Sequence, residues 1–152
     1  MANQFKFIRV DRFFDDMNRE DCFDTEDMDG ISPNFRFVLA SDCKQNIEDC
    51  LDIDGTLDLN EVTLLDTDGA DDGMCSMLWS QGINGERSMS ISDSTVSFDI
   101  GEDTANIKGI FLCAVNNGTG YVIAYCILDK VLEVDGVLIL PCNGMVWSVH
   151  YG

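Results

Sequence analysis

The stretch that decides the fold of this chain runs from Asn106 to Val131 and reads NIKGIFLCAVNNGTGYVIAYCILDKV. Two apolar runs flank a short loop of Asn, Gly and Thr at residues 116–120. Asn and Gly accept the positive φ values that a tight turn requires. The stretch therefore predicts a β-hairpin with its first strand at residues 106–115 and its return strand at residues 121–131.

The return strand of this hairpin is apolar on both of its faces. Successive side chains of a strand point to opposite faces, so one face carries Tyr121, Ile123, Tyr125 and Ile127 and the other carries Val122, Ala124, Cys126 and Leu128. An antiparallel strand with one face in water alternates apolar and polar residues instead. We therefore expect the hairpin to be covered on both sides. A second sheet would cover one side, and either the acidic first half of the chain or a neighbouring subunit would cover the other.

Turn signals recur through the rest of the chain and divide it into short strands. Asp-Gly or Asn-Gly pairs stand at residues 54–55, 68–69, 72–73, 84–85, 135–136 and 143–144. Short strands with regular turns are typical of an all-β sandwich or barrel. In addition to the hairpin, we expect strands at Phe5–Val10, Phe35–Ala40, Thr56–Leu65, Met74–Ser80, Arg87–Ser92, Thr95–Ile100, Val137–Leu140 and Met145–Tyr151.

The predicted fold is all-β with a minor α content, in the form of an antiparallel β-sandwich or jelly-roll-like domain. The helical part is one short helix within residues 42–50, with Ser41 or Asp42 as its N-cap. The last third of the chain, from the hairpin to the C-terminus, is expected to form a contiguous antiparallel meander. At 152 residues the chain has the usual length of one domain.

The chain is strongly acidic, with a formal net charge of −19. Residues 1–72 hold 20 Asp and Glu against 6 Lys and Arg, so most of the charge lies in the first half. Nucleic acids and anionic membrane surfaces attract clustered Lys and Arg, so neither is expected as a partner. No apolar run is long enough to span a bilayer, and the first residues do not read as a secretory signal. The charge suits a basic protein partner or metal cations, or serves solubility alone.

The N-terminal part is expected to be an acidic arm or docking segment at residues 1–34, followed by a β-sandwich domain at residues 35–152. The arm combines its acidic residues with Phe13, Phe14 and Phe23. A purely solvated segment carries few aromatics, so these three residues predict an interface at which the arm anchors to a partner. The apolar hairpin predicts self-association or a repeated place on a larger particle.

The best candidate for a metal site lies between Cys50 and Glu61. This segment matches most of the calcium-loop pattern, with Gly55 at the sharp turn and Glu61 at the bidentate position. Cys50 stands at the first position, where a thiol is a poor ligand for a hard cation. The candidate ligands are Asp52, Asp54, Asp58 and Glu61. The alternative is an acidic hairpin built on an Asp-Gly turn, with Leu57, Leu59 and Val62 in the strand that follows.

The sequence does not assemble a catalytic set, so we expect no enzyme activity, no catalytic residue and no cofactor other than calcium at this loop. His150 is the one histidine of the chain, and its position favours the surface of a last strand. A phosphate-binding glycine loop and a dinucleotide fingerprint are both missing. The seven cysteines, at residues 22, 43, 50, 75, 113, 126 and 142, have no Cys-x-x-Cys spacing and predict free thiols in a reducing compartment.

Four segments of the second half, Gly109–Leu112, Gly118–Tyr125, Val134–Leu140 and Asn143–Trp147, carry a resemblance to a known group. Together they resemble the closing meander of small virion proteins of tailed bacteriophages, and the acidic, cysteine-containing composition is similar to that of crAss-like phages. The resemblance covers roughly residues 106–152 and shares a pattern rather than a motif, so it assigns no site residue.

The resemblance implies a structural role in a virion that is assembled in the host cytoplasm. The protein would be a capsid auxiliary or decoration subunit, or a tail or connector component, present in many copies. Its partners would then be other virion proteins, such as the major capsid protein. The alternative is a calcium-binding or ligand-binding β-domain of cellular origin.

Overall fold

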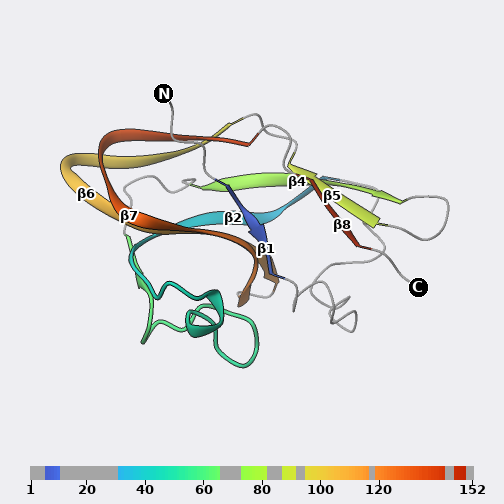
Figure 1. The fold of residues 1–152 in the computed structure, drawn as a ribbon. Helices are drawn as coiled ribbons and strands as arrows, with labels where there is room; N and C mark the ends of the chain where they lie inside the picture. The colour runs from blue at the N-terminus through green and yellow to red at the C-terminus, as the bar shows by residue number, and fades with distance from the viewer. Residues whose placement is uncertain are drawn as a thin grey trace.

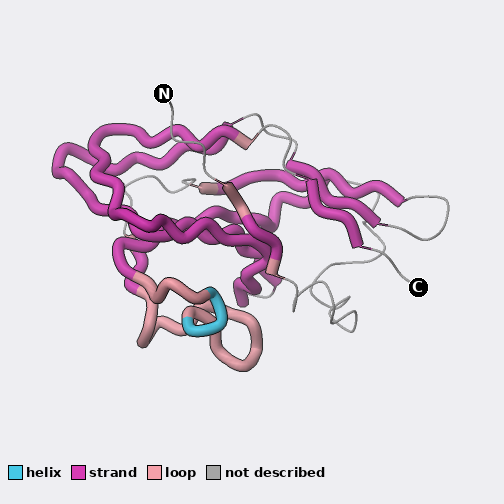
Figure 2. Tube along the Cα trace, in the orientation of Figure 1, coloured by secondary structure: helices cyan, strands magenta, loops and turns pink. Residues whose placement is uncertain are grey.

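A computed structural model gives the fold of the chain and describes residues 6–10, 31–65, 73–81, 87–91, 95–116, 119–142 and 146–149. Within these ranges the structure is built from antiparallel strands, and its helical content is a single 3-10 turn (Figure 2). The prediction of an all-β chain with minor helix is confirmed in this form.

The described elements follow one another as β1 (Ile8–Arg9), β2 (Ile31–Asp42), the 3-10 turn η3 (Ile47–Asp49), β3 (Thr63–Leu64), β4 (Met74–Gln81), β5 (Arg87–Ile91), β6 (Thr95–Asn116), β7 (Thr119–Pro141) and β8 (Val146–Val149). Hydrogen bonds join the strands in the order β1-β7-β6-β2-β4-β5-β8, and β3 pairs with β2 outside this path.

Strands β6 and β7 are the two longest strands of the described structure, and they are much longer than predicted. Their 22 and 23 residues each merge two strands that the turn signals had separated. The Asp-Gly pair at residues 135–136 does not reverse the chain. Instead, Gly136 (φ 70°) lies opposite Gly101 (φ 91°) in the register, and both adopt a positive φ that only glycine reaches without strain. The two glycines let both strands bend at the same level.

This bend folds the β6–β7 pair back on itself, as Figure 1 shows. We call the pairing of residues 107–116 with 119–132 the proximal ribbon and the pairing of residues 95–99 with 137–141 the distal ribbon. The proximal ribbon pairs with β2, from Phe35 opposite Ala114 to Ala40 opposite Gly109.

The distal ribbon returns to the opposite edge of β2 through the backbone of one residue, Gly73. The N–H of Phe37 donates to the carbonyl oxygen of Gly73 at 2.7 Å, and the N–H of Gly73 donates to the carbonyl oxygen of Ser97 at 3.1 Å. The two halves of β6 therefore flank β2 on both sides, one directly and one through this glycine.

The buried residues form one core cluster, which is built mainly from β2, β6 and β7 and also includes residues of the segment that follows β2. Its largest fully buried side chains come from β2, β6 and β7, and they include Phe35, Phe37, Leu39, Phe98, Ile107, Ile110, Phe111, Leu112, Ile123 and Leu140. The burial of three consecutive residues of β6, from Ile110 to Leu112, means that both faces of the proximal ribbon are covered. This confirms the prediction of a doubly covered hairpin.

The second cover comes from the first half of the chain rather than from a neighbouring subunit. A Cβ atom placed on Gly109 would lie 2.9 Å from the thiol sulfur of Cys43 and 3.2 Å from the ring of Phe111, so residue 43 packs directly on this face. The segment from Cys43 to Val62 continues over it and lies on the opposite side of the proximal ribbon from the distal ribbon (Figure 1). Since one chain covers both faces, the apolar hairpin no longer supports self-association.

The N-terminal segment belongs to the sheet. Ile8 and Arg9 pair with Tyr125 and Ala124 of β7, and the N–H of Val10, which is buried, donates to the carbonyl oxygen of Ile123 at 2.9 Å. The expected arm at residues 1–34 therefore contains strand β1, the buried residue Val10 beside it and also the start of β2. The rest of that range lies outside the described residues.

Three local predictions are wrong. The predicted closing meander is wrong, because β8 pairs with β5 and not with β7. The pairing runs from Arg87 opposite Val149 to Ser90 opposite Val146. In place of the expected strand at Thr56–Leu65, only β3 at Thr63–Leu64 is a strand, because much of the segment before it forms turns. The short helix is the 3-10 turn η3, capped by the side chain of Asn46 and not by Ser41 or Asp42.

Candidate functional site

The candidate metal ligands lie in the acidic loop, which we define as residues 43–62. Asp52 uses both carboxylate oxygens inside its own turn. Its Oδ1 accepts from the N–H of Asp54 at 2.9 Å and from the N–H of Thr56 at 3.2 Å, and its Oδ2 accepts from the hydroxyl of Thr56 at 2.5 Å. These hydrogen bonds favour the charged form, and the hydroxyl of Thr56 contributes most to lowering the pKa of Asp52. The carboxylate acts as the cap of an Asp-Gly turn.

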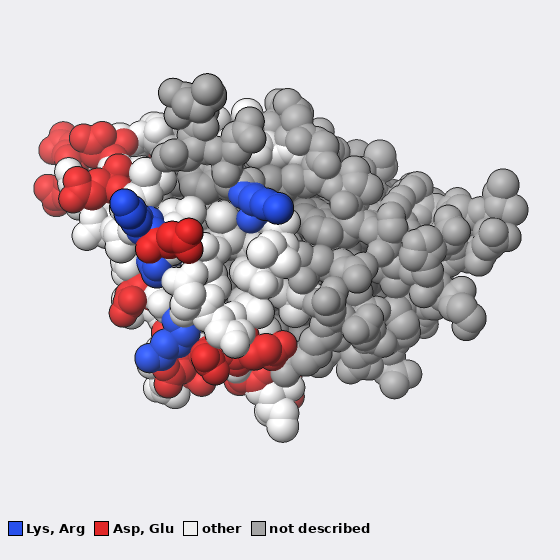
Figure 3. Space-filling model, viewed as in Figure 1, with Lys and Arg blue, Asp and Glu red and all other residues white. Residues whose placement is uncertain are grey.

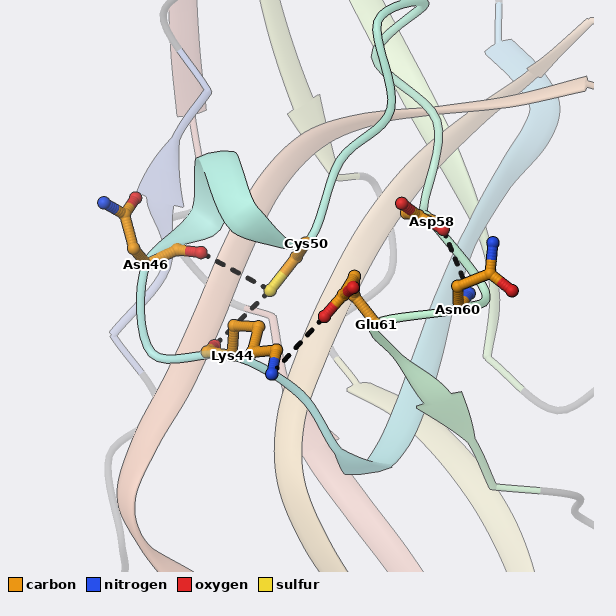
Figure 4. Close-up of polar contacts among 6 residues, drawn as sticks. All are labelled: Lys44, Asn46, Cys50, Asp58, Asn60 and Glu61. Atoms are coloured by element: carbon orange, nitrogen blue, oxygen red, sulfur yellow. Dashed lines mark hydrogen bonds and ion pairs between the residues drawn. The ribbon is translucent and has the colours of Figure 1, made fainter.

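The other carboxylates of the loop also have local roles (Figure 4). Asp58 accepts from the N–H of Asn60 at its Oδ1, 3.0 Å away, and its carbonyl oxygen accepts from the N–H groups of Glu61 and Val62. The carboxylate of Glu61 lies 3.4 Å from the ammonium of Lys44. Asp54 is exposed at the tip of the turn.

This geometry matches the acidic-hairpin interpretation better than a calcium loop. Within the described ranges, no three His, Cys, Asp or Glu side chains lie close enough together to hold a metal ion. A calcium loop turns its carboxylates inward around one point, whereas Asp52, Asp58 and Glu61 are directed to separate partners. Calcium binding at Asp52, Asp54, Asp58 and Glu61 is therefore the less favoured of the two interpretations, and calorimetry with added calcium tests it.

Lys108 of β6 links the acidic loop to β7. On β6 it is the one residue between Ile107 and Gly109, whereas the facing segment of β7 has four residues, 128–131, so the ladder is interrupted there. The ammonium of Lys108 donates to the carbonyl oxygen of Leu128, to that of Asp129 at 3.4 Å and to the side chain of Gln45 at 3.2 Å. One lysine thus supplies hydrogen bonds to carbonyl oxygens where the ladder is interrupted, and it also contacts the start of the acidic loop.

The middle of the loop is tied to β7 by backbone contacts. Leu51 and Leu57 form an antiparallel bridge within the loop, and Thr56 forms a second bridge with Tyr121. The N–H of Val122 donates to the carbonyl oxygen of Gly55 at 3.0 Å. These contacts make the loop an edge element of the sheet and give a structural reason for its Asp-Gly turn.

Five cysteines have described side chains, and all five are buried free thiols: Cys43, Cys50, Cys113, Cys126 and Cys142. Burial raises the pKa of Cys43 and of Cys113 to about 12, and it raises the pKa of Cys50 and Cys126 as well. The thiol of Cys50 donates to the carbonyl oxygens of Lys44 and Asn46, at 3.4 and 3.6 Å (Figure 4). Thiols in such settings pack as small apolar groups and are poor nucleophiles.

A second candidate site lies on the outer face of the distal ribbon. Side chains alternate along β7, so Leu140 is fully buried while Val137 and Ile139 are 62% and 59% exposed. Across the ladder, Asp99 stands opposite Val137 and Ser97 opposite Ile139, and both are exposed. Val137 and Ile139 are therefore neighbours on one face, which makes them an apolar pair rather than two scattered exposed residues.

An open hollow of about 520 Å³ adjoins this pair where the ribbon bends; it is lined by Asp99, Gly101, Glu102, Asp135, Gly136 and Val137. Three of these residues are carboxylates, and acidic side chains gather over this end of the ribbon in Figure 3. The side chain of Asp99 accepts a hydrogen bond from the N–H of Gly101 at 3.2 Å. The hollow therefore combines negative charge with one apolar wall.

The sequence did not reveal this second site. The sequence predicts a strand at Val137–Leu140, but all four of its residues are apolar, so the sequence does not distinguish a buried face from an exposed one. The exposure of alternate residues depends on where the ribbon bends and on what lies beneath it. The interface residues Phe13, Phe14 and Phe23 and the lone His150 lie outside the described residues.

Comparisons with known proteins give no relative: no family model, curated protein or solved structure matches the chain. In the part of the chain that the structure describes, no helix is long and apolar enough to cross a membrane.

Proposed function

We propose that this protein is a non-enzymatic virion structural protein, either a capsid auxiliary or decoration subunit or a component of a tail or connector. The observation that carries the proposal is the apolar pair Val137 and Ile139, exposed on one face of a chain whose net charge is −19. Apolar groups that stay on the surface of a protein this acidic are typical of an interface that a partner covers.

The charge supports the same role. Free copies that each carry a charge of −19 repel one another, which keeps them soluble and apart before assembly. A partner that carries Lys and Arg attracts them and speeds their association. The other virion proteins, such as the major capsid protein, are the proposed partners, and copies of this chain would repeat because the partner repeats.

The finer fold proposal is a β-sandwich or jelly-roll-like closure. The distal ribbon would form one layer, and β2 with the proximal ribbon would form the other. The ring of Phe98 on the distal ribbon supports this arrangement, because a Cβ atom on Gly73 would lie 2.8 Å from it and 3.1 Å from the carbonyl carbon of Phe37. Such a closed domain suits a subunit that must hold its shape on a particle.

The N-terminal arm is a second proposed contact of the same assembly. Phe13, Phe14 and Phe23 would anchor it to the partner surface, as large aromatics often do at interfaces. Residues 6–10 are excluded from this role, because Val10 is part of the core. Replacing the three phenylalanines by serine is expected to weaken assembly while leaving the core residues in place.

Protein mass spectrometry of purified particles tests the proposed function. Particles would be isolated by density gradient from the source of this sequence, and the copy number of the chain would be measured against the major capsid protein. A reproducible ratio in intact particles supports the proposal. If the chain is absent from particles but abundant in the lysate, the proposal is wrong.

A further inference from the structure

We propose that the outer face of the distal ribbon is a docking surface for a protein segment that presents Lys or Arg side chains beside apolar ones. This inference rests on the proposed function and deepens it, because it names the surface and the chemistry of the partner. Val137 and Ile139 form the apolar centre of the surface, and the carboxylates at the bend form its rim.

The distal ribbon has one buried face and one exposed face. Val96 and Phe98 of β6 and Leu140 of β7 point into the core and are at most 4% exposed. The residues between them, Ser97 and Ile139 among others, are exposed. The core side is therefore already filled, and the opposite side is an exposed surface two strands wide. A preformed surface of this kind loses little freedom when a partner binds.

The hollow gives this surface a place for one long cationic side chain. Its lining brings Val137 together with the carboxylates of Asp99, Glu102 and Asp135. A Lys or Arg side chain matches that combination, because its aliphatic stem covers apolar surface while its charged head reaches acceptors. Arg fits especially well, since its planar guanidinium binds carboxylates through paired hydrogen bonds.

Charge decides between a basic partner and a second copy of this chain. A second copy would bring the same three carboxylates to the contact and a further net charge of −19. Like charges brought face to face at an interface oppose association and suppress a wrong partner. The occupant is therefore a foreign segment with basic side chains, and the apolar pair adds the contact area that an acidic rim lacks.

Glycine at position 136 leaves the hollow open. A Cβ atom on Gly136 would meet nothing within 4 Å, although the φ of 70° strains most side chains. Asn tolerates this conformation better than other non-glycine residues. The variant Gly136→Asn would thus place a side chain in the hollow without a clash and block the docking surface while the ribbon stays folded.

Backbone NMR with a defined probe tests the inference. The probe is a blocked heptapeptide in which three Arg alternate with Leu and Val, and the control peptide keeps the three Arg but replaces Leu and Val by Ser and Gly. Titration to about 1 mM peptide at about 0.15 M salt should shift the amide signals of residues 97–102 and 135–139. The control peptide should bind roughly tenfold more weakly, since it lacks the apolar contact.

Matched variants separate the surface from general attraction to acid. Val137→Thr with Ile139→Thr keeps two β-branched residues and should weaken probe binding roughly tenfold; Gly136→Asn should do the same. Val131→Thr, at a residue that is 50% exposed but outside this face, should leave binding unchanged. The spectrum of each variant reports directly whether it is folded.

Three outcomes would overturn the inference. They are the absence of any shift in the distal ribbon, equal shifts in the acidic loop at residues 43–62, and equal binding of the two peptides. The acidic loop is a stringent comparison, because it also combines carboxylates with exposed apolar side chains, Ile53 and Leu59 at 88% and 68% exposure. Probe binding to the ribbon of a chain that is absent from particles would contradict the proposed function alone, whereas a particle protein that fails this titration would contradict the docking surface alone.

Discussion

The N–H of Phe37 donates to the carbonyl oxygen of Gly73 at 2.7 Å, and a Cβ atom on Gly73 would lie only 2.0 Å from the carbonyl oxygen of Phe37. No side chain fits at that distance. The close approach of two backbones is what joins β2 to the distal ribbon, because the N–H of the same glycine reaches Ser97. The fold of this chain therefore depends on a glycine that lies outside its long strands.

Replacing Gly73 by Ala is expected to destabilise the protein by at least about 3–4 kcal/mol, since backbone must move to make room. Gly136→Ala is the matched control. Both glycines have a positive φ, of 77° and 70°, but a Cβ atom on Gly136 meets nothing within 4 Å. The control should cost about 1–2 kcal/mol, from backbone strain alone. Urea unfolding of both variants measures the difference, and equal losses would contradict the role of Gly73 in joining β2 to the distal ribbon.

Lys108 provides the second prediction. Its ammonium donates hydrogen bonds to the carbonyl oxygens of Leu128 and Asp129, which lie where the β6–β7 ladder is interrupted. Lys108→Met keeps the aliphatic stem and removes the donor, so the part-buried carbonyl oxygen of Leu128 loses its partner at a cost of about 2 kcal/mol. Lys130→Met, at an exposed residue on β7, should change stability by less than about 0.5 kcal/mol. A stability of Lys108→Met equal to that of the control would show that water replaces the ammonium.

The sequence predicted the all-β class, the hairpin and the double covering of its strands, because apolar alternation and Asn-Gly turn chemistry are local properties. It did not predict that β6 and β7 continue through Gly101 and Asp135-Gly136. A glycine with positive φ serves a reversing turn and a bend within a strand equally well. The choice between them depends on strands that are distant in sequence, above all on the pairing across Gly101 and Gly136.

The candidate site shows a similar division. The acidic residues of the loop at 43–62 match a calcium pattern in spacing, but spacing does not reveal where a carboxylate points. The hydroxyl of Thr56 and the ammonium of Lys44 engage Asp52 and Glu61, and neither contact follows from the pattern. The exposed pair Val137 and Ile139 could not be recognised either, since its exposure depends on which face of the distal ribbon packs against the core.

Slow thiol chemistry is the third prediction. A pKa of about 12 leaves roughly one Cys43 or Cys113 thiol in ten thousand ionised at pH 8, and burial also blocks the reagent. In the native protein the five described cysteines should therefore react slowly with a disulfide reagent such as DTNB. After denaturation without reductant, nearly all seven should react at once. A shortfall of two or more thiols in the denatured protein would reveal a disulfide.

Acid should weaken the turn at Asp52. The pKa of this carboxylate is lower in the folded state than its ordinary value of 3.8. Its contribution to stability is therefore fully present above that value and is lost as the pH falls through the folded pKa. The stability difference between the wild type and Asp52→Asn should be constant from pH 8 to about pH 5 and should shrink below about pH 4. Asp49→Asn controls for the loss of one negative charge from the same loop.

Calcium should not stabilise the protein, because the loop carboxylates would have to leave their present partners. A calcium loop needs several oxygens around one point, whereas both oxygens of Asp52 accept hydrogen bonds and Glu61 contacts Lys44. A ligand that binds only the folded state raises stability by RT ln(1 + [L]/Kd), so a calcium concentration one hundred times the Kd would add about 2.7 kcal/mol. Differential scanning calorimetry with about 5 mM calcium, against the same concentration of magnesium, measures this directly. An unchanged Tm is expected in both salts. A rise of several degrees with calcium that Glu61→Gln abolishes would support the alternative function, a calcium-binding β-domain, and would contradict a purely structural role for the acidic loop.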